Sequence, residues 1–258
     1  MYSFSGKIKL VAIISMVVGL LGIGYSFIAT PSTVEALGAH ASHDPAHAEH
    51  VLHLLQNKPW AALYVAALFF MLISLGVLAF YAINRAAQAG WAPILFRVME
   101  GITGYLPIGA LIFFLLLVFS GLHFNHLFIW MDPAVVAHDK VIQGKTGYLN
   151  VPFFLVRAAV YMLGWIAYRQ ITRKLSKAQD QAHDNRPFVK AFKWSAGFLV
   201  FFLVSESMMS WDWVMSVDPH WFSTLFGWYV FGSLIASAIA AIILVTVTLK
   251  SQGYLEHV

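Results

Sequence analysis

The sequence of 258 residues is 60% hydrophobic and 11% charged, with a mean hydropathy of +0.73. A soluble domain carries about 25% charged residues because its surface faces water, so this composition excludes an ordinary soluble domain. The net charge of +4 does not indicate nucleic-acid binding, because the charges lie at the ends of apolar runs. The absence of cysteine excludes disulfides, thiolate zinc sites and cysteine-bound iron–sulfur clusters within this chain.

Six apolar runs are long enough to cross a bilayer. A hydrocarbon core of about 30 Å takes roughly 20 helical residues, and lipid offers no partner for free backbone groups. The runs lack the strict alternation of a transmembrane barrel. The sequence therefore predicts an all-α membrane protein, a polytopic transmembrane helix bundle with spans at Ile8–Ala29, Trp60–Ile83, Gly101–His123, Leu149–Ile171, Phe192–Trp211 and Thr224–Leu249.

Lysine and arginine are distributed unevenly between the two sides of this layout. With the N-terminus in the cytoplasm, twelve of them lie on the cytoplasmic side and three on the outer side. The positive-inside rule therefore predicts that both ends of the sequence are cytoplasmic. Residues 172–191 are predicted to form a polar cytoplasmic linker, and residues 30–58 a histidine-rich periplasmic loop. The outer segment 124–148 is predicted to carry a short interfacial helix.

The periplasmic loop contains five histidines. Asp44 and Pro45 would cap a short helix that places His47 and His50 on one face at a spacing of three residues. Such a pair binds zinc or copper only with a third ligand, and no carboxylate or sulfur of the loop stands at a spacing that indicates such a ligand. We therefore predict no metal site and favour a solvated or partner-facing helix, with the other histidines of the loop at His40, His43 and His53.

Two ionisable residues lie deep inside predicted spans. Arg157 is about 12 Å below the outer end of span four, and Glu206 lies at a similar depth in span five. A charge among lipid tails costs a few kcal/mol or more, so it normally faces a partner or water. The sequence predicts an Arg157–Glu206 ion pair or a shared polar cavity. The alternative is a structural clasp between two helices without chemistry.

More titratable residues gather at the outer boundary of the spans. His123 and His126 follow span three, and Asp212, Asp218 and His220 lie between spans five and six. Acids and imidazoles at such spacing can pass protons. The alternative is an aromatic interfacial belt with helix caps, since Asp218 followed by proline suits a helix start.

On the cytoplasmic side, Glu100 is the comparable residue. It could admit protons, but a first-turn glutamate stabilised by the helix dipole is the favoured interpretation.

A bundle that carries haem b needs two histidines inside the spans, and here only His123 reaches a span edge. The sequence contains no P-loop, dinucleotide fingerprint or flavin motif.

The last quarter of the sequence resembles a known family. Two stretches carry the resemblance, SWDWVMSVDPHWFSTLFGWYVF at 210–231 and LKSQGYL at 249–255. They are similar to the ActF family of bacterial alternative complex III, whose members are integral membrane proteins of the wider NrfD/polysulfide-reductase group. The similarity is long and specific over 192–255. Upstream it is looser, although the short N-terminus, the variable outer loop and Glu100 at the start of span three agree with the family layout.

The resemblance implies a place in a respiratory complex of the bacterial inner (cytoplasmic) membrane, a quinol:cytochrome c or quinol:oxidase oxidoreductase. The implied partners are a second NrfD-like membrane subunit, an iron–sulfur subunit and multihaem cytochrome c subunits. Haem c and iron–sulfur clusters are expected in those partners, and neither a redox cofactor nor a catalytic residue in this chain. Residues 1–258 would form a single NrfD-like transmembrane domain in contact with lipids, and no nucleic acid is expected.

Members of the ActF family are expected to support proton translocation. The resemblance makes the polar residues of the bundle candidates for the path: Glu100, His123, Arg157, Glu206, Asp212, Asp218 and His220. One alternative is direct binding of quinol or menaquinol, with His123, Glu206 and Asp212 bonding the ring oxygens. Another is a scaffold without chemistry. The family has about ten spans of about 20 residues each, so we expect its C-terminal part to be absent from this sequence.

Overall fold

The computed structural model describes residues 5–35 and 45–254, with side chains from residue 51 onward in the second range and Ala48 before it. These residues contain helices and no strand. Six helical segments are long and apolar enough to span a membrane, so the predicted polytopic bundle is confirmed. They are α1 (Gly6–Ala29), α2 (Pro45–Ala86), α3 (Pro93–Ile102) continued by η2 (Thr103–Tyr105) and α4 (Leu106–Gly121), α7 (Val151–Gln181), α8 (Arg186–Trp213) and α9 (Phe226–Ser251).

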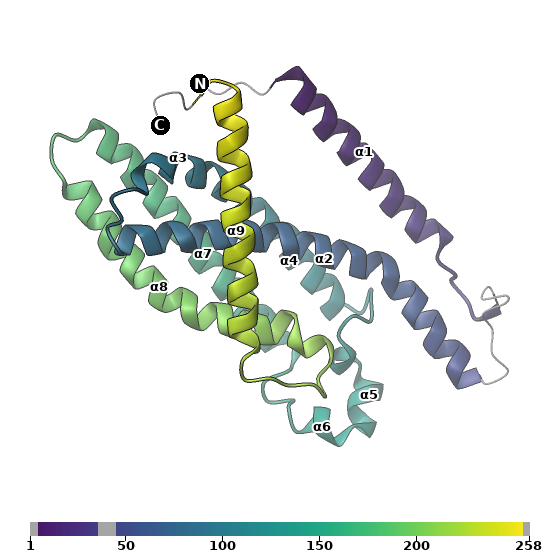
Figure 1. Ribbon diagram of the computed structural model, residues 1–258. Coiled ribbons are helices and arrows are strands. Elements are labelled where there is room, and N and C mark those ends of the chain that lie inside the picture. The colour runs from purple at the N-terminus through teal and green to yellow at the C-terminus, as the bar shows by residue number, and fades with distance from the viewer. Residues whose placement is uncertain (1–4, 36–44, 255–258) are drawn as a thin grey trace.

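Helices α2, α4, α7, α8 and α9 pack around one another, whereas α1 stands apart from them (Figure 1). The core lies along α2, which packs against α4, α8 and α9 and in which Met71, Leu75 and Leu78 are buried. No residue of α1 is buried. Its contact with the bundle lies near its C-terminal end, where the rings of Phe27 and Trp60 meet edge to face at 5.2 Å.

The two ends of the bundle differ in chemistry. At one end, called the basic end here, α2, α7 and α9 finish and α3 and α8 begin. At the other, called the loop end, lie residues 122–150 and 214–225. The predicted short helix in 124–148 is confirmed as two, α5 (Pro133–His138) and α6 (Lys140–Gln143). Asp132 and Asp139 cap them by accepting bonds from the backbone N–H groups of Ala134 and Val141, each at 2.8 Å.

Several helices extend well beyond the predicted spans. Helix α2 starts at Pro45 and continues through Pro59, so the second half of the predicted loop 30–58 is helical. The predicted linker 172–191 is also mostly helical, because α7 runs to Gln181 and α8 starts at Arg186. Its alanine, lysine and glutamine residues are good helix formers in water. The connection is closed by Gln179, which donates to the carbonyl of Asp184 and accepts from the N–H of Phe188.

Helices α2 and α9 approach each other closely at Gly76. A Cβ atom at this position would lie 2.7 Å from the backbone oxygen of Leu234 and 3.0 Å from the Cβ of Ala238. Lipid supplies little hydrophobic drive for helix association, so small residues that let backbones approach are a main source of packing energy. The interface between the second and the last described spans therefore depends on this glycine.

Gly76→Ala is expected to push α2 and α9 apart and to lower the free energy of unfolding by about 1–3 kcal/mol, since an extra methyl group cannot fit without backbone movement. Thermal unfolding in detergent micelles measures the loss. Gly197→Ala in α8 is the matched control, because nothing lies within 4 Å of a Cβ there. Equal unfolding midpoints for the two variants would contradict the packing argument.

Candidate functional site

A buried ion pair joins α7 and α8 near the loop end. The guanidinium of Arg157 donates from Nε to Oδ2 and from Nη2 to Oδ1 of Asp212, both at 2.8 Å. The exposed fractions of the two side chains are 5% and 0%. Nη1 of Arg157 also donates to the backbone oxygen of Tyr148 at 3.0 Å. Two parallel bonds of this kind form the strongest pairing available to a guanidinium and a carboxylate.

The predicted Arg157–Glu206 ion pair is therefore wrong. The partner of Arg157 is Asp212, which stands six residues nearer the loop end of α8. Side chains in a helix point back toward its N-terminus, so Arg157 reaches from the second turn of α7 toward the loop end. Helix α8 continues to Trp213, beyond the predicted end of span five, and this extension brings Asp212 into reach.

Aromatic rings enclose the ion pair. The guanidinium carbon of Arg157 lies 3.9 Å from the ring centre of Tyr148 and 4.3 Å from that of Phe153. The hydroxyl of Tyr161 donates to Asp212 at 3.3 Å. Burial and then the negative charge of Asp212 raise the pKa of Tyr148, which precedes α7. Tyr161 thus contributes a donor to the carboxylate, and Tyr148 contributes a ring face to the guanidinium.

Glu206 is buried without a charged partner. Its side chain is 2% exposed, and Oε1 has no hydrogen-bond partner among the described residues. Helical spacing places it on the same face of α8 as Met209 and Trp213, about 9 Å deeper than Asp212. An unpaired carboxylate in such a place costs far more than a neutral acid. The site therefore fits a carboxyl group that holds a proton.

The histidines at the loop end form a separate pocket. The rings of His53 and His126 meet at 4.4 Å, and His123 lines the same pocket with a left-handed φ of 61°. Burial, and then the neighbouring His53, lower the pKa of His126. Neither Glu206 nor Asp212 lines this pocket. The structure thus does not bring together the three residues of the alternative quinol site.

No group of three or more metal-binding side chains occurs within the described part of the chain. Of the five histidines in 30–58, only His53 has a described side chain. His40 and His43 lie outside the described residues, and so do the side chains of His47 and His50. The helix predicted from Asp44 and Pro45 is present as the start of α2, with Asp44 itself outside the described residues.

Asp218 and His220 lie in the turn between α8 and α9, at the protein surface. The helix expected to start at Pro219 does not form, because α9 begins at Phe226. Asp218 instead accepts the backbone N–H of His220 at 3.1 Å. The ring Nε2 of His220 lies 2.6 Å from Asp139. The backbone N–H of Ile142 and, more weakly, His220 hold the pKa of Asp139 below its usual value.

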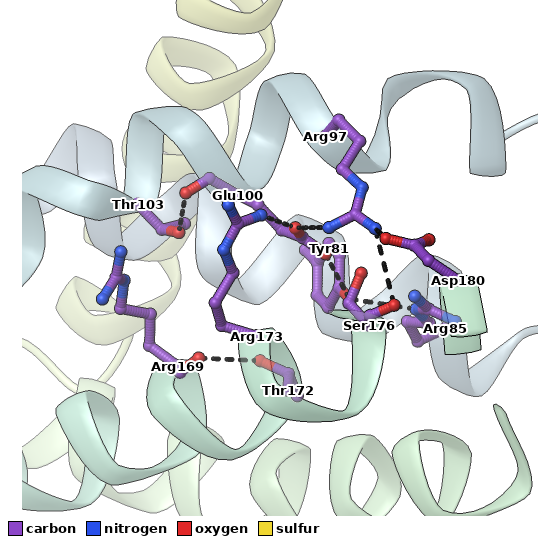
Figure 2. Close-up of polar contacts among 10 residues, drawn as sticks. All are labelled: Tyr81, Arg85, Arg97, Glu100, Thr103, Arg169, Thr172, Arg173, Ser176 and Asp180. Atoms are coloured by element: carbon purple, nitrogen blue, oxygen red, sulfur yellow. Dashed lines mark hydrogen bonds and ion pairs between the residues drawn. The ribbon is translucent and has the colours of Figure 1, made fainter. Parts of the chain in front are cut away.

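A second buried carboxylate lies at the basic end (Figure 2). Glu100 is 6% exposed and accepts from Nη1 of Arg97 at 2.9 Å, from Arg173 and from the hydroxyl of Tyr81 at 3.3 Å. Arg97 also pairs with Asp180 at the end of α7. The cluster ties α2, α3 and α7 together.

The interpretation of Glu100 as a first-turn residue is wrong. Helix α3 begins at Pro93, so Glu100 stands in the last turns, where the helix dipole disfavours a negative charge. The two arginines supply the compensation instead. A sequence signal was present, since Pro93 is the first residue of α3 and proline is typical of that position.

Hydroxyl groups that sequence reasoning missed link α7 and α8 between these clusters. The hydroxyls of Tyr168 and Ser195 are 2.8 Å apart, and Nε1 of Trp165 donates to Ser205 at 3.0 Å. All four side chains are buried. Serine and tyrosine are common on any helix face, so only the pairing in three dimensions distinguishes these residues.

Compared with known proteins, the sequence matches no family model and no curated protein. The fold and the contacts define a polytopic helical membrane protein with a buried ion pair near the loop end, a buried carboxylate held by arginines at the basic end, and an unpaired acid between them.

Asp212→Asn is expected to lower the free energy of unfolding by about 3–5 kcal/mol, because it leaves the charge of Arg157 buried and uncompensated. Thermal unfolding in detergent measures the effect. Asp184→Asn is the control, since Asp184 pairs with Arg186 at the exposed turn between α7 and α8 and should cost nothing measurable.

A double variant, Arg157→Leu with Asp212→Leu, is expected to be more stable than Asp212→Asn, because it removes both charges together. If the double variant proved less stable than the single one, the desolvation argument would be wrong.

Proposed function

We propose that this chain is a membrane subunit, without a redox cofactor of its own, of a quinol:cytochrome c or quinol:oxidase oxidoreductase in the respiratory chain, and that it supports proton translocation. The resemblance of residues 192–255 to the ActF family of alternative complex III motivates the assignment to such a complex. The observation that carries the proton role is the buried, unpaired carboxyl group of Glu206.

Among the candidate residues, Glu206 is the best proton carrier. A residue that carries protons must be able to exist both protonated and deprotonated, with little difference in free energy between the two states. Glu100 and Asp212 are each held by arginine, so a proton would have to displace that pairing. Glu206 has no such partner, and ionisable groups of this kind inside membranes mark proton relays.

The described hydroxyls support a route from Glu206 toward the basic end. Ser205 is the neighbour of Glu206 on α8, and Tyr168 with Ser195 lies further along the same interface. Hydroxyls donate and accept, so they can pass protons with the help of intervening water. Toward the loop end, the Arg157–Asp212 ion pair would be a charged barrier between Glu206 and the solvent on that side.

The proposed location is the bacterial inner (cytoplasmic) membrane, with the basic end in the cytoplasm. Lysine and arginine are concentrated at this end, where Arg97, Arg173 and Lys250 lie, as the positive-inside rule requires of a cytoplasmic face. The N-terminus and the connection between α7 and α8 would then be cytoplasmic. Residues 122–150 and 214–225 would face the periplasmic partners that carry haem c and iron–sulfur clusters.

Purification of the tagged chain from its native membranes is expected to bring down a multihaem cytochrome, an iron–sulfur protein and a second membrane subunit. Protein mass spectrometry and the visible spectrum of haem c identify these partners. An irrelevant multi-pass protein with the same tag is the control. A solitary chain or a homo-oligomer would contradict the proposed assembly.

Glu206→Gln is expected to abolish the protons translocated in addition to those that the oxidation of each quinol itself releases, because an amide cannot take up and give back a proton as a carboxyl group does. Proton release from the reconstituted complex is measured with a pH-sensitive dye while haem reduction reports turnover.

Glu206→Asp keeps a carboxyl group and serves as the control that should retain most of the proton release. A complex that assembles poorly with Glu206→Gln, yet releases protons normally for each quinol, would favour the scaffold alternative over the proton role.

A further inference from the structure

The basic end carries more positive than negative charge inside its polar cluster (Figure 2). Its acids are Glu100 and Asp180, and both are engaged by arginine. Its arginines are Arg85, Arg97, Arg169 and Arg173. Four positive charges against two negative ones leave a surplus of two, which attracts anions to this end.

Arg85 and Arg169 account for the surplus, and they differ in their surroundings. Arg85 donates to the hydroxyl of Tyr81 at 3.1 Å, and its guanidinium carbon lies 4.2 Å from the ring centre of Phe96. Arg169 has a buried Nε atom with no hydrogen-bond partner among the described residues. The guanidinium of Arg169 is therefore the place in the cluster where an acceptor is missing.

The guanidinium of Arg169 lies against the turn between α3 and α4. Its Nη2 atom lies 3.6 Å from the position that a Cβ would take at Gly104. Arg173, one turn further along α7, already binds Glu100 with Nη1. An anion beside this turn would face the guanidinium of Arg169, with that of Arg173 one helical turn away.

The depth of Arg169 matches that of phospholipid headgroups. It stands 18 residues after the start of α7 at Val151, which is about 27 Å along the helix and close to the thickness of the hydrocarbon core. Exposed apolar side chains continue from Gly104 along α4 into the span, with Ile108 59% exposed and Leu111 61% exposed. A ligand there would have a charged head and apolar tails.

We propose that Arg169, assisted by Arg173, binds the phosphodiester group of an anionic phospholipid at the basic end. The planar guanidinium matches two phosphate oxygens at once and is held at a depth where the phosphate sits. Basic pockets between transmembrane helices are suited to such headgroups. The acyl chains lie along α4 past Ile108 and Leu111. This site is independent of the proposed function in respiration.

Native mass spectrometry of the full chain in detergent tests the site. Phosphatidylglycerol is titrated into delipidated protein, and phosphatidylcholine is the comparison, because its choline cation offsets the phosphate charge. The wild type is expected to bind phosphatidylglycerol more tightly than phosphatidylcholine. Arg169→Gln is expected to weaken phosphatidylglycerol binding about tenfold, the equivalent of one charge-assisted bond.

Arg186→Gln is the matched control, since Arg186 is an exposed arginine of the same end whose variant should bind phosphatidylglycerol as the wild type does. Arg169→Lys should bind phosphatidylglycerol with intermediate affinity, because lysine keeps the positive charge but lacks the planar group that binds two oxygens at once. Thermal unfolding of each variant identifies any that fails to fold, and Arg169→Lys then replaces Arg169→Gln.

Three outcomes would overturn the proposal. The first is equal affinity for the two lipids in the wild type. The second is unchanged phosphatidylglycerol binding in a folded Arg169 variant. The third is displacement of the lipid by inorganic phosphate at equal concentration, which would make the site one for a free anion.

Discussion

The Arg157–Asp212 ion pair sets the arrangement of the loop end, and the reason is the cost of keeping charge away from water. Neither residue could remain where it is alone, so α7 and α8 must lie side by side in one register. The carbonyl of Tyr148 and the rings of Tyr148 and Phe153 complete the shell around the guanidinium. The segment that precedes α7 is thereby fixed to the bundle as well.

At the basic end, too, a buried charge is compensated by charges of the opposite sign, here by two arginines around one carboxylate. Glu100 is buried in the last turns of α3, where its own helix disfavours it, and arginines from α3 and α7 compensate. Between the two ends, Glu206 is buried without any such compensation, and a carboxyl group can tolerate this place only in its neutral form. The molecule thus has paired charges at its two ends and an unpaired acid between them.

The sequence predicted the six spans because their length and apolarity follow from the thickness of the membrane alone. It did not predict that α2 and α7 continue beyond the membrane, since polar helix formers carry no hydropathy signal. The need of Arg157 for a partner was predictable from its depth. The identity of that partner was not, because Asp212 and Glu206 are both acids of α8, and only the relative position of α7 and α8 along their axes decides which of them Arg157 meets. The hydroxyl pair of Tyr168 and Ser195 gave no signal at all in the sequence.

The contact of Gly76 with α9 has a consequence for biogenesis. The contacting residues Gly76 and Leu234 are far apart in the chain, and at a synthesis rate of about 5–20 residues per second the ribosome needs roughly 10–30 s to travel between them. During that interval α2 is in the bilayer with its glycine face uncovered. Lipids or an insertion factor must cover this face of α2 until α9 is inserted. The nascent protein therefore passes through an intermediate in which α2 is in the membrane but not yet packed against α9.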